Sequence, residues 1–293
     1  MSKDNIEIIY EDSDIIAINK PAGISDTHDR SGKVNLINYL HNQRKDQQSL
    51  KIVHQLDKDT SGIMLLAKNT DAQRKLSEYF EKGRVRKIYL ALITGSPAAC
   101  GEQSRTEKTG IIDAPIAPNR KNPQIMEVDL KKGKEARTKW ELVADFGSIS
   151  LIAARPQTSR THQIRVHLQY AGMPLAIDPL YGQNQAIMLS SFKADYKLGK
   201  YEEEKPLIDR LALCAYELEI ENLHPVRDKA SLMPDGRLWR PVSNGIHLIA
   251  PLEKKFKAAI KMLTKYNPKG PAAFVKEENF NRLLASQPLL LQL

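Results

Sequence analysis

Cysteine is scarce in this sequence, which has two cysteines, Cys100 and Cys214, among 293 residues. Two thiols cannot make a disulfide framework or a cysteine-rich zinc site. Long hydrophobic runs are missing too. The longest uninterrupted apolar runs, 88–93 and 211–216, fall far short of the roughly 20 residues that span a bilayer. No basic region followed by an apolar stretch opens the chain, so no secretory signal is expected. These absences predict a cytoplasmic protein with no membrane association.

The charge balance is the first positive signal. The chain carries 44 Lys and Arg against 35 Asp and Glu, a formal net charge of +9. A basic excess favours an anionic partner, nucleic acid above all. Many soluble proteins are mildly basic without such a partner, so charge alone leaves both interpretations open. The 41% hydrophobic and 27% charged residues indicate an ordinary globular protein with enough apolar material for a sizeable core.

Short segments rich in β-branched residues are interspersed with amphipathic ones. Strands are expected at 6–10, 14–19, 52–56, 63–67, 86–94, 139–144, 148–153 and 211–220. Helices are expected at 34–44, 71–82, 161–170 and 251–266, and Ser159 or Thr161 is expected to cap the third. Strands dominate without a regular βαβ alternation, so the fold class is predicted as α+β.

The densest polar segment is His54-Gln55-Leu56-Asp57-Lys58-Asp59-Thr60-Ser61-Gly62, between two expected strands. A carboxylate on such a loop is positioned by rigid elements, as catalytic groups often are. A calcium loop is excluded, because Lys68 occupies its twelfth position, where a bidentate Glu is needed. A phosphate-transfer aspartate loop is disfavoured, because the downstream acidic residues that would hold magnesium are not suitably spaced. A plain turn, in which Asp57 and Thr60 bond to the local backbone, stays open.

A second polar segment, 160–168, falls in the third expected helix. His162 and Arg165 are three residues apart and share a helix face. His162 and His167 are separated by about 140° around the axis, which makes them a poor metal pair. The segment is either a surface helix with solvated basic residues or a helix that positions Arg165 toward a partner. In the second case the guanidinium would keep a buried carboxylate ionised and oriented.

Seven blocks follow one another along the chain. They are Asn19-Lys20-Pro21-Ala22-Gly23, His54 to Gly62, Arg86-Lys87-x-Tyr89-x-Ala91, Arg160-x-His162-Gln163-Ile164-Arg165-x-His167-Leu168, Asp178-Pro179-Leu180-Tyr181-Gly182, Arg210-Leu211-Ala212-Leu213 and His224-Pro225. In this order they closely resemble the RluA-type RNA pseudouridine synthases, and the resemblance covers most of the chain. One such block is a weak signal, whereas seven in the right order are highly specific.

The resemblance implies a fold and a chemistry. The family folds as a mixed, mainly antiparallel sheet flanked by helices and loops around a basic cleft. Its reaction breaks the N1–C1′ bond of uridine, turns the base and joins C5 to C1′, without a metal or cofactor. The implied function is the isomerisation of specific uridines to pseudouridine in structured ribosomal or transfer RNA. A base inside a helix must first be flipped into a pocket.

The resemblance also implies roles for individual residues. Asp57 corresponds to the essential catalytic aspartate, and Tyr89 to the tyrosine that packs on the target uracil. Arg165 corresponds to the arginine that pairs with the aspartate. Ile164 or Leu168 would close the uracil pocket. The remaining substrate-binding residues expected from these blocks are His54, Gln55, Thr60 and Arg160.

The sequence departs from the family pattern at several places. Gln55 stands where the family usually has an arginine linked with displacing the flipped base. Ser25-Asp26-Thr27-His28 replaces the common Val-His-Pro. Gln55 favours a rival interpretation, an RNA-binding or RNA-chaperone protein on the same fold with weak or lost catalysis. A magnesium-dependent phosphatase is a third alternative.

The chain ends suggest a domain organisation. Because 18 residues precede Asn19, the small N-terminal RNA-binding domain of many relatives is not expected. We expect a catalytic domain at 1–245 and a helical, lysine-rich extension at 246–293, packed on or beside it. The polar face of this extension is either solvated or contributes to RNA binding through Lys254, Lys255, Lys257 and Lys261. A monomer is the default expectation.

Overall fold

The computed structural model describes residues 5–26, 35–44, 50–97, 108–198, 203–221, 223 and 245–293. Contacts divide the chain into two compact units. The first unit comprises Met1–Ile88 and Ala215–Pro251, and the second unit comprises Tyr89–Cys214 and Leu252–Leu293. Cys100, Thr27-His28 and the His224-Pro225 block lie outside the described residues.

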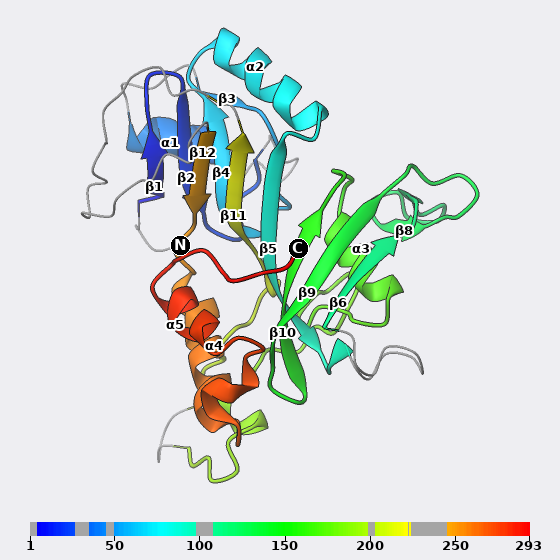
Figure 1. Ribbon diagram of the computed structural model, residues 1–293, viewed down its shortest axis with the longest axis vertical. Coiled ribbons are helices and arrows are strands. Elements are labelled where there is room, and N and C mark those ends of the chain that lie inside the picture. The colour runs from blue at the N-terminus through cyan, green and yellow to red at the C-terminus, as the bar shows by residue number, and fades with distance from the viewer. Residues whose placement is uncertain are drawn as a thin grey trace. The chain divides into compact units, whose positions relative to one another are not determined.

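Six strands belong wholly or mostly to the first unit. They are β1 (Glu7–Glu11), β2 (Ile15–Lys20), β3 (Lys51–Ile52), β4 (Ser61–Ala67), β11 (Leu213–Glu221) and β12 (Gly245–Ile249). Figure 1 shows β1, β2, β4 and β11 side by side, and they pair in this order. β3 pairs with β4, and β12 pairs with β11.

The core of the first unit follows from its sequence patterns. All seven residues of β4, Ser-Gly-Ile-Met-Leu-Leu-Ala, are buried, as expected for a strand covered on both faces. The helices are α1 (Leu36–Gln43) and α2 (Thr70–Glu81). The Asn69 side chain caps α2 by accepting the Ala72 N–H, and Leu76 and Tyr79 are on its buried face. Beyond its end, Gly83 adopts a φ of 66°, a conformation that glycine tolerates.

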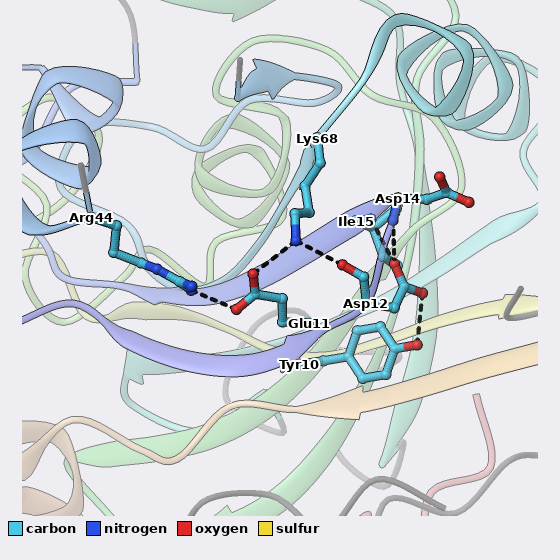
Figure 2. A network of polar contacts seen from close by, with 7 residues as sticks. All are labelled: Tyr10, Glu11, Asp12, Asp14, Ile15, Arg44 and Lys68. Atoms are coloured by element: carbon cyan, nitrogen blue, oxygen red, sulfur yellow. Dashed lines mark hydrogen bonds and ion pairs between the residues drawn. The ribbon is translucent and has the colours of Figure 1, made fainter. Parts of the chain in front are cut away.

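A polar network fixes the turn between β1 and β2 (Figure 2). One carboxylate oxygen of Asp12 accepts the N–H groups of Asp14 and Ile15 at 2.8 and 2.7 Å, and the other accepts the Tyr10 hydroxyl at 2.8 Å. Glu11 binds Lys68, which follows β4, and Arg44, which follows α1. The turn is therefore tied to both neighbouring elements by charge-assisted hydrogen bonds.

The second unit contains a run of antiparallel strands. β5 (Val85–Thr94), β10 (Ile149–Pro156), β9 (Arg137–Asp145) and β6 (Thr109–Asp113) pair in this order. β7 (Ile116–Pro118) and β8 (Met126–Val128) form a separate antiparallel pair. The helices are α3 (Gln163–Tyr170), α4 (Lys254–Tyr266) and α5 (Glu278–Leu284), with short 3-10 helices at Leu189–Ser191 and Gly270–Ala273.

Helix α4 has the expected amphipathic pattern. Its buried residues are Phe256, Ala259, Ile260, Leu263 and Thr264. Two of its lysines hold it in place: Lys255 Nζ lies 2.7 Å from the Asp209 carboxylate, and Lys257 Nζ donates to the carbonyl of Leu284. The side chains of Lys254, Lys261 and Lys265 are exposed.

The α+β class and the mixed, mostly antiparallel sheet are confirmed. Two local expectations are wrong. The strand expected at 52–56 ends at Ile52. The N-cap position of α3 is His162, and neither Ser159 nor Thr161 caps the helix with its side chain. The short elements β6, β7, β8, β12 and α5 were not predicted. The structure groups residues 252–293 with the second unit, while the domain boundary expected after residue 245 stays a prediction. In the described ranges, no helix is long and apolar enough to cross a membrane.

Candidate active site

The loop that carries Asp57 connects β3 to β4. Leu56 is buried, Asp57 is half-buried, and Lys58 and Asp59 are exposed. The Thr60 N–H donates to the Asp57 carbonyl at 3.0 Å and closes a turn. The expected turn therefore exists, but this bond uses the Asp57 backbone and not its carboxylate.

Glycine is required where this loop enters β4. Gly62 has a φ of +112°, and a Cβ atom there would lie 2.0 Å from the carbonyl oxygen of Ala215. A side chain would be both strained and in collision with backbone at this position. The neighbouring strand therefore sets the path of the loop just after Thr60.

A fully buried lysine, Lys20, binds the backbone of the Asp57 loop. The Lys20 ammonium donates to the carbonyls of Asp57, Lys58 and Thr60 at 3.2, 3.0 and 3.0 Å. Lysine has three N–H donors, so these three carbonyls satisfy it. Burial lowers the pKa of Lys20 to about 8, against the opposing effect of Asp26, Asp59 and Asp57. Lys20 is therefore protonated at neutral pH, and its charge strengthens the three bonds.

His54 is anchored in the same unit. Its Nε2 accepts the Leu65 N–H at 2.9 Å, and its ring stacks on Phe80 with centroids 4.6 Å apart. Burial, and then the charge of Lys87, lowers the pKa of His54 to about 3. The imidazole is therefore neutral, and since Nε2 accepts, its proton is on Nδ1.

The two other predicted binding residues on this loop differ in their access to solvent. Gln55 is exposed, so its amide is available to a partner. Thr60 is buried, and within the described part of the chain its hydroxyl has no hydrogen-bond partner. Such an orphaned polar atom is unusual in a protein interior.

Tyr89 lies in β5 of the second unit. It pairs with Ala154 of β10 and is 8% exposed. Because β5 is buried and paired with its neighbours, it holds the backbone of Tyr89 in a fixed position.

Arg165 of α3 is bound by a carboxylate that the sequence did not identify. Its Nε and Nη2 donate to the two oxygens of Asp178, each at 2.8 Å, and the side chains are 7% and 0% exposed. One Asp178 oxygen also accepts the N–H groups of Leu180 and Tyr181. The guanidinium carbon lies 5.0 Å from the centre of the Tyr181 ring. The Asp178-to-Gly182 block is therefore a turn folded around Asp178 that orients Arg165.

His162 and Tyr181 form a second contact at the start of α3. His162 has a φ of 54°, a left-handed conformation that is uncommon for histidine. The Tyr181 hydroxyl oxygen accepts the Met126 N–H at 2.7 Å and lies 2.8 Å from His162 Nδ1. The Tyr181 hydroxyl therefore links His162, at the start of α3, to Met126 of β8.

Other residues of the 160–168 block serve the fold. Gln163 bonds to Thr138, Thr158 and the backbone, and the buried His167 bonds to Thr138 and the Ala114 carbonyl. Arg160 donates from Nε to the Glu135 carbonyl.

The two aliphatic candidates for closing the uracil pocket are both buried. Leu168 is 0% exposed and Ile164 is 6% exposed.

The structure brings the predicted site residues together in two groups. His54, Gln55, Asp57 and Thr60 are on one loop of the first unit, whereas Tyr89, Arg160, Ile164, Arg165 and Leu168 belong to the second. The pairing of Asp57 with Arg165 stays a prediction, and the contact described for Arg165 is with Asp178. Lys20, Asp178 and Tyr181 had been noted only as members of sequence blocks, and the signal that could have singled them out was the presence of ionisable or polar groups in apolar surroundings.

Comparisons with known proteins agree on one family. Residues 14–170 match the family model described as RNA pseudouridylate synthase. Ribosomal large subunit pseudouridine synthase D of Borreliella burgdorferi is 35% identical over 215 residues, which are 68% of this chain and 64% of that protein. An uncharacterised RNA pseudouridine synthase of Zymomonas mobilis is 37% identical over 77% of this chain and 93% of its own length. Ribosomal large subunit pseudouridine synthase C of Vibrio parahaemolyticus is 34% identical over 89% and 70%, respectively.

Two solved structures share the fold. Human RNA pseudouridylate synthase domain containing 1 matches with a TM-score of 0.57 and 22% identity, over 90% of this chain and 96% of that chain. Human RNA pseudouridylate synthase domain containing 4 matches with a TM-score of 0.59 and 20% identity, over 88% and 92%. At these identities the likeness establishes the fold alone.

Proposed function

Because the chain belongs to the RNA pseudouridylate synthase family, we propose that it isomerises uridine to pseudouridine in ribosomal or transfer RNA, with Asp57 as the essential catalytic residue. The observation that carries this proposal is the Asp57 loop, whose backbone is bound at three carbonyls by the buried Lys20. A reacting group gains most from a fixed backbone, because misplacement by about 1 Å can cost on the order of a hundredfold in rate.

The reaction needs an ionised carboxylate and no change of redox state. The N1–C1′ bond of uridine breaks, the base turns, C5 bonds to C1′, the hydrogen on C5 is lost to water as a proton, and N1 takes up a proton. Asp57 acts either as a nucleophile on the sugar or the ring, or as the base that removes a proton from C2′. Each route requires the same half-buried carboxylate, and none requires a metal or cofactor.

The second unit would supply the remaining groups. Tyr89 stacks on the flipped uracil, a contact worth roughly 1–3 kcal/mol. By the family resemblance, Arg165 is assigned to pair with the catalytic aspartate. Asp178 binds Nε and Nη2 of Arg165 and so fixes the orientation of the guanidinium plane. Ile164, with its residual exposure, is a better candidate than Leu168 for the wall of the uracil pocket.

Gln55 supports a second candidate function. It is exposed on the Asp57 loop, where an arginine would assist the displacement of the base. A glutamine can hydrogen-bond but has no charge, so flipping would be less efficient or would depend on the RNA context. In the extreme case the protein would bind RNA on this fold without modifying it.

The test is the release of tritium from RNA labelled at C5 of uridine, in EDTA, with RNA from cells that lack this protein. Isomerisation expels that hydrogen at any target site, so no site needs to be assumed. We expect release by the wild type and none by Asp57→Asn, which should still bind RNA. A fully folded wild-type protein that binds RNA and releases no tritium would instead support the RNA-binding function. In that case Gln55→Arg would be the first variant to examine. Release abolished by EDTA would contradict the proposed chemistry.

A further inference from the structure

We propose that Asp26 is a positioning residue, which fixes the peptide backbone of the Asp57 loop so that the Asp57 carboxylate is held in its reactive place. This inference rests on the proposed function for its effect on rate. Its structural part stands by itself. Asp26 is at one of the positions where the chain departs from the family pattern.

The carboxylate of Asp26 binds the loop directly. Its Oδ2 accepts the N–H of Leu56, the residue before Asp57, at 2.7 Å. Asp26 is 5% exposed, so little water competes for this bond. A charge-assisted bond to a backbone N–H in such surroundings is stronger than a neutral one.

Asp26 completes a set of bonds from one short segment. Lys20, at the end of β2, binds the carbonyls of Asp57, Lys58 and Thr60. The Gly23 N–H donates to the Lys58 carbonyl at 2.9 Å. Residues 20–26 therefore hold the loop on both sides of Asp57, with Asp26 bonded before it and Lys20 and Gly23 after it. Asp26 is the member of this set that accepts a hydrogen bond.

Charge balance gives Asp26 a second role. Its Oδ1 lies 4.0 Å from Lys20 Nζ, and in the described ranges Oδ1 has no hydrogen-bond partner. A buried charge without a counter-charge is costly. The Asp26 carboxylate therefore helps to keep Lys20 protonated, and so maintains the three bonds that Lys20 makes.

The two groups titrate on either side of neutrality. Burial raises the pKa of Asp26 to about 6, an effect that Lys20 and the Leu56 N–H oppose and Asp57 reinforces. Burial lowers the pKa of Lys20 to about 8, opposed by Asp26, Asp59 and Asp57. Between these values both are charged and the loop has all its charged anchors. Below about pH 6 Asp26 is protonated and its attraction to Lys20 is lost.

Two substitutions separate the contributions. Asp26→Val removes both the acceptor and the charge, and Asp26→Asn keeps an acceptor for Leu56 but removes the charge. In the tritium-release assay we expect kcat to fall by about tenfold to a hundredfold in Asp26→Val, since the reacting carboxylate is displaced. Asp26→Asn should show a smaller fall, and KM for RNA should change little in both. In the wild type, activity should fall as the pH drops through about 6. In Asp26→Asn this acid limb should move to lower pH. Asp59→Asn is the matched control, because Asp59 is exposed and its charge also favours protonated Lys20. In the described part of the chain, its carboxylate accepts no backbone N–H as that of Asp26 does.

Amide hydrogen exchange tests the structural part without activity. We expect residues 54–60 to exchange faster in both Asp26 variants than in the wild type, while the β4 amides keep their protection. Failure of the proposed function would appear as no tritium release by the wild type, with the exchange difference intact. The positioning role would be overturned by unchanged kcat, pH profile and exchange. It would also be overturned if activity fell only in proportion to the loss of folded protein.

Discussion

The buried pair of Arg165 and Asp178 permits a quantitative prediction. Asp178→Asn keeps the shape of the side chain and one oxygen for the N–H groups of Leu180 and Tyr181, which Asp178 binds at 2.9 and 3.2 Å. It removes the negative charge that faces a guanidinium only 7% exposed. Removing one partner of a buried ion pair costs about 3–5 kcal/mol, because the remaining charge is left uncompensated. We therefore expect the free energy of unfolding to fall by this amount, as measured by urea denaturation.

A second substitution separates stability from catalysis. Arg165→Met in the Asp178→Asn background removes the uncompensated charge and leaves an apolar side chain of similar length. Replacing a buried ion pair by apolar groups is often close to neutral, so the double variant should recover most of the lost stability. Tritium release should stay low in both single variants and in the double variant, because the guanidinium is misoriented or absent.

The control is an ion pair at the surface. Asp71 and Arg74 are 3.5 Å apart with exposed side chains, so Asp71→Asn should lower the free energy of unfolding by less than about 1 kcal/mol. Two results would refute the reasoning. One is a loss of less than about 1 kcal/mol in Asp178→Asn, which is the range of exposed pairs. The other is a double variant as unstable as the sum of the two single ones, which would mean that the charges do not interact.

Three further predictions concern the loop, the C-terminal helix and pH. Gly62→Ala should destabilise the fold more than Gly23→Ala in urea denaturation. Both positions have positive φ, but only at Gly62 would the new Cβ meet backbone, 2.0 Å away; equal losses would contradict the clash. Neutralising Lys254, Lys261 and Lys265, three of the four exposed lysines of α4, should weaken RNA binding and reduce the slope of log K against log salt by about 2–3. Lys255→Gln, at the fourth exposed lysine, should reduce this slope by less than about 1, because its ammonium is bound to Asp209. Because the pKa of His54 is about 3 in the folded protein and about 6.5 in an unfolded chain, the unfolded state binds more protons. Stability from this residue is therefore complete above pH 6.5 and is lost as the pH falls toward 3. His54→Gln should flatten this dependence in urea titrations, and an unchanged slope would argue against a buried neutral His54.

Local patterns in the sequence determined most of the regular structure. The apolar run of β4 and the helical spacing of α2 and α4 are patterns among residues close together in the chain, so they can be recognised from the sequence alone. All three elements are present in the structure. Short elements such as β7 and β8, with three residues each, are too brief for a period to be recognised. The strand expected at 52–56 failed because its last residues belong to the polar loop that follows.

The sequence by itself also located the candidate site, because the polar residues from His54 to Gly62 interrupt two apolar segments and match a family pattern. The tertiary structure alone decided the partners of the charged groups. Lys20 is opposite Gly62 in the register of β2 and β4, and this pairing brings its ammonium under a loop 37 residues away in the chain. Asp178 reaches Arg165 through the turn that follows α3, and Asp26 reaches Leu56 across 30 residues. The physical reason is that a buried charge must find a compensating group. Which group it finds depends on strand register and turn geometry, which are set by contacts between distant parts of the chain.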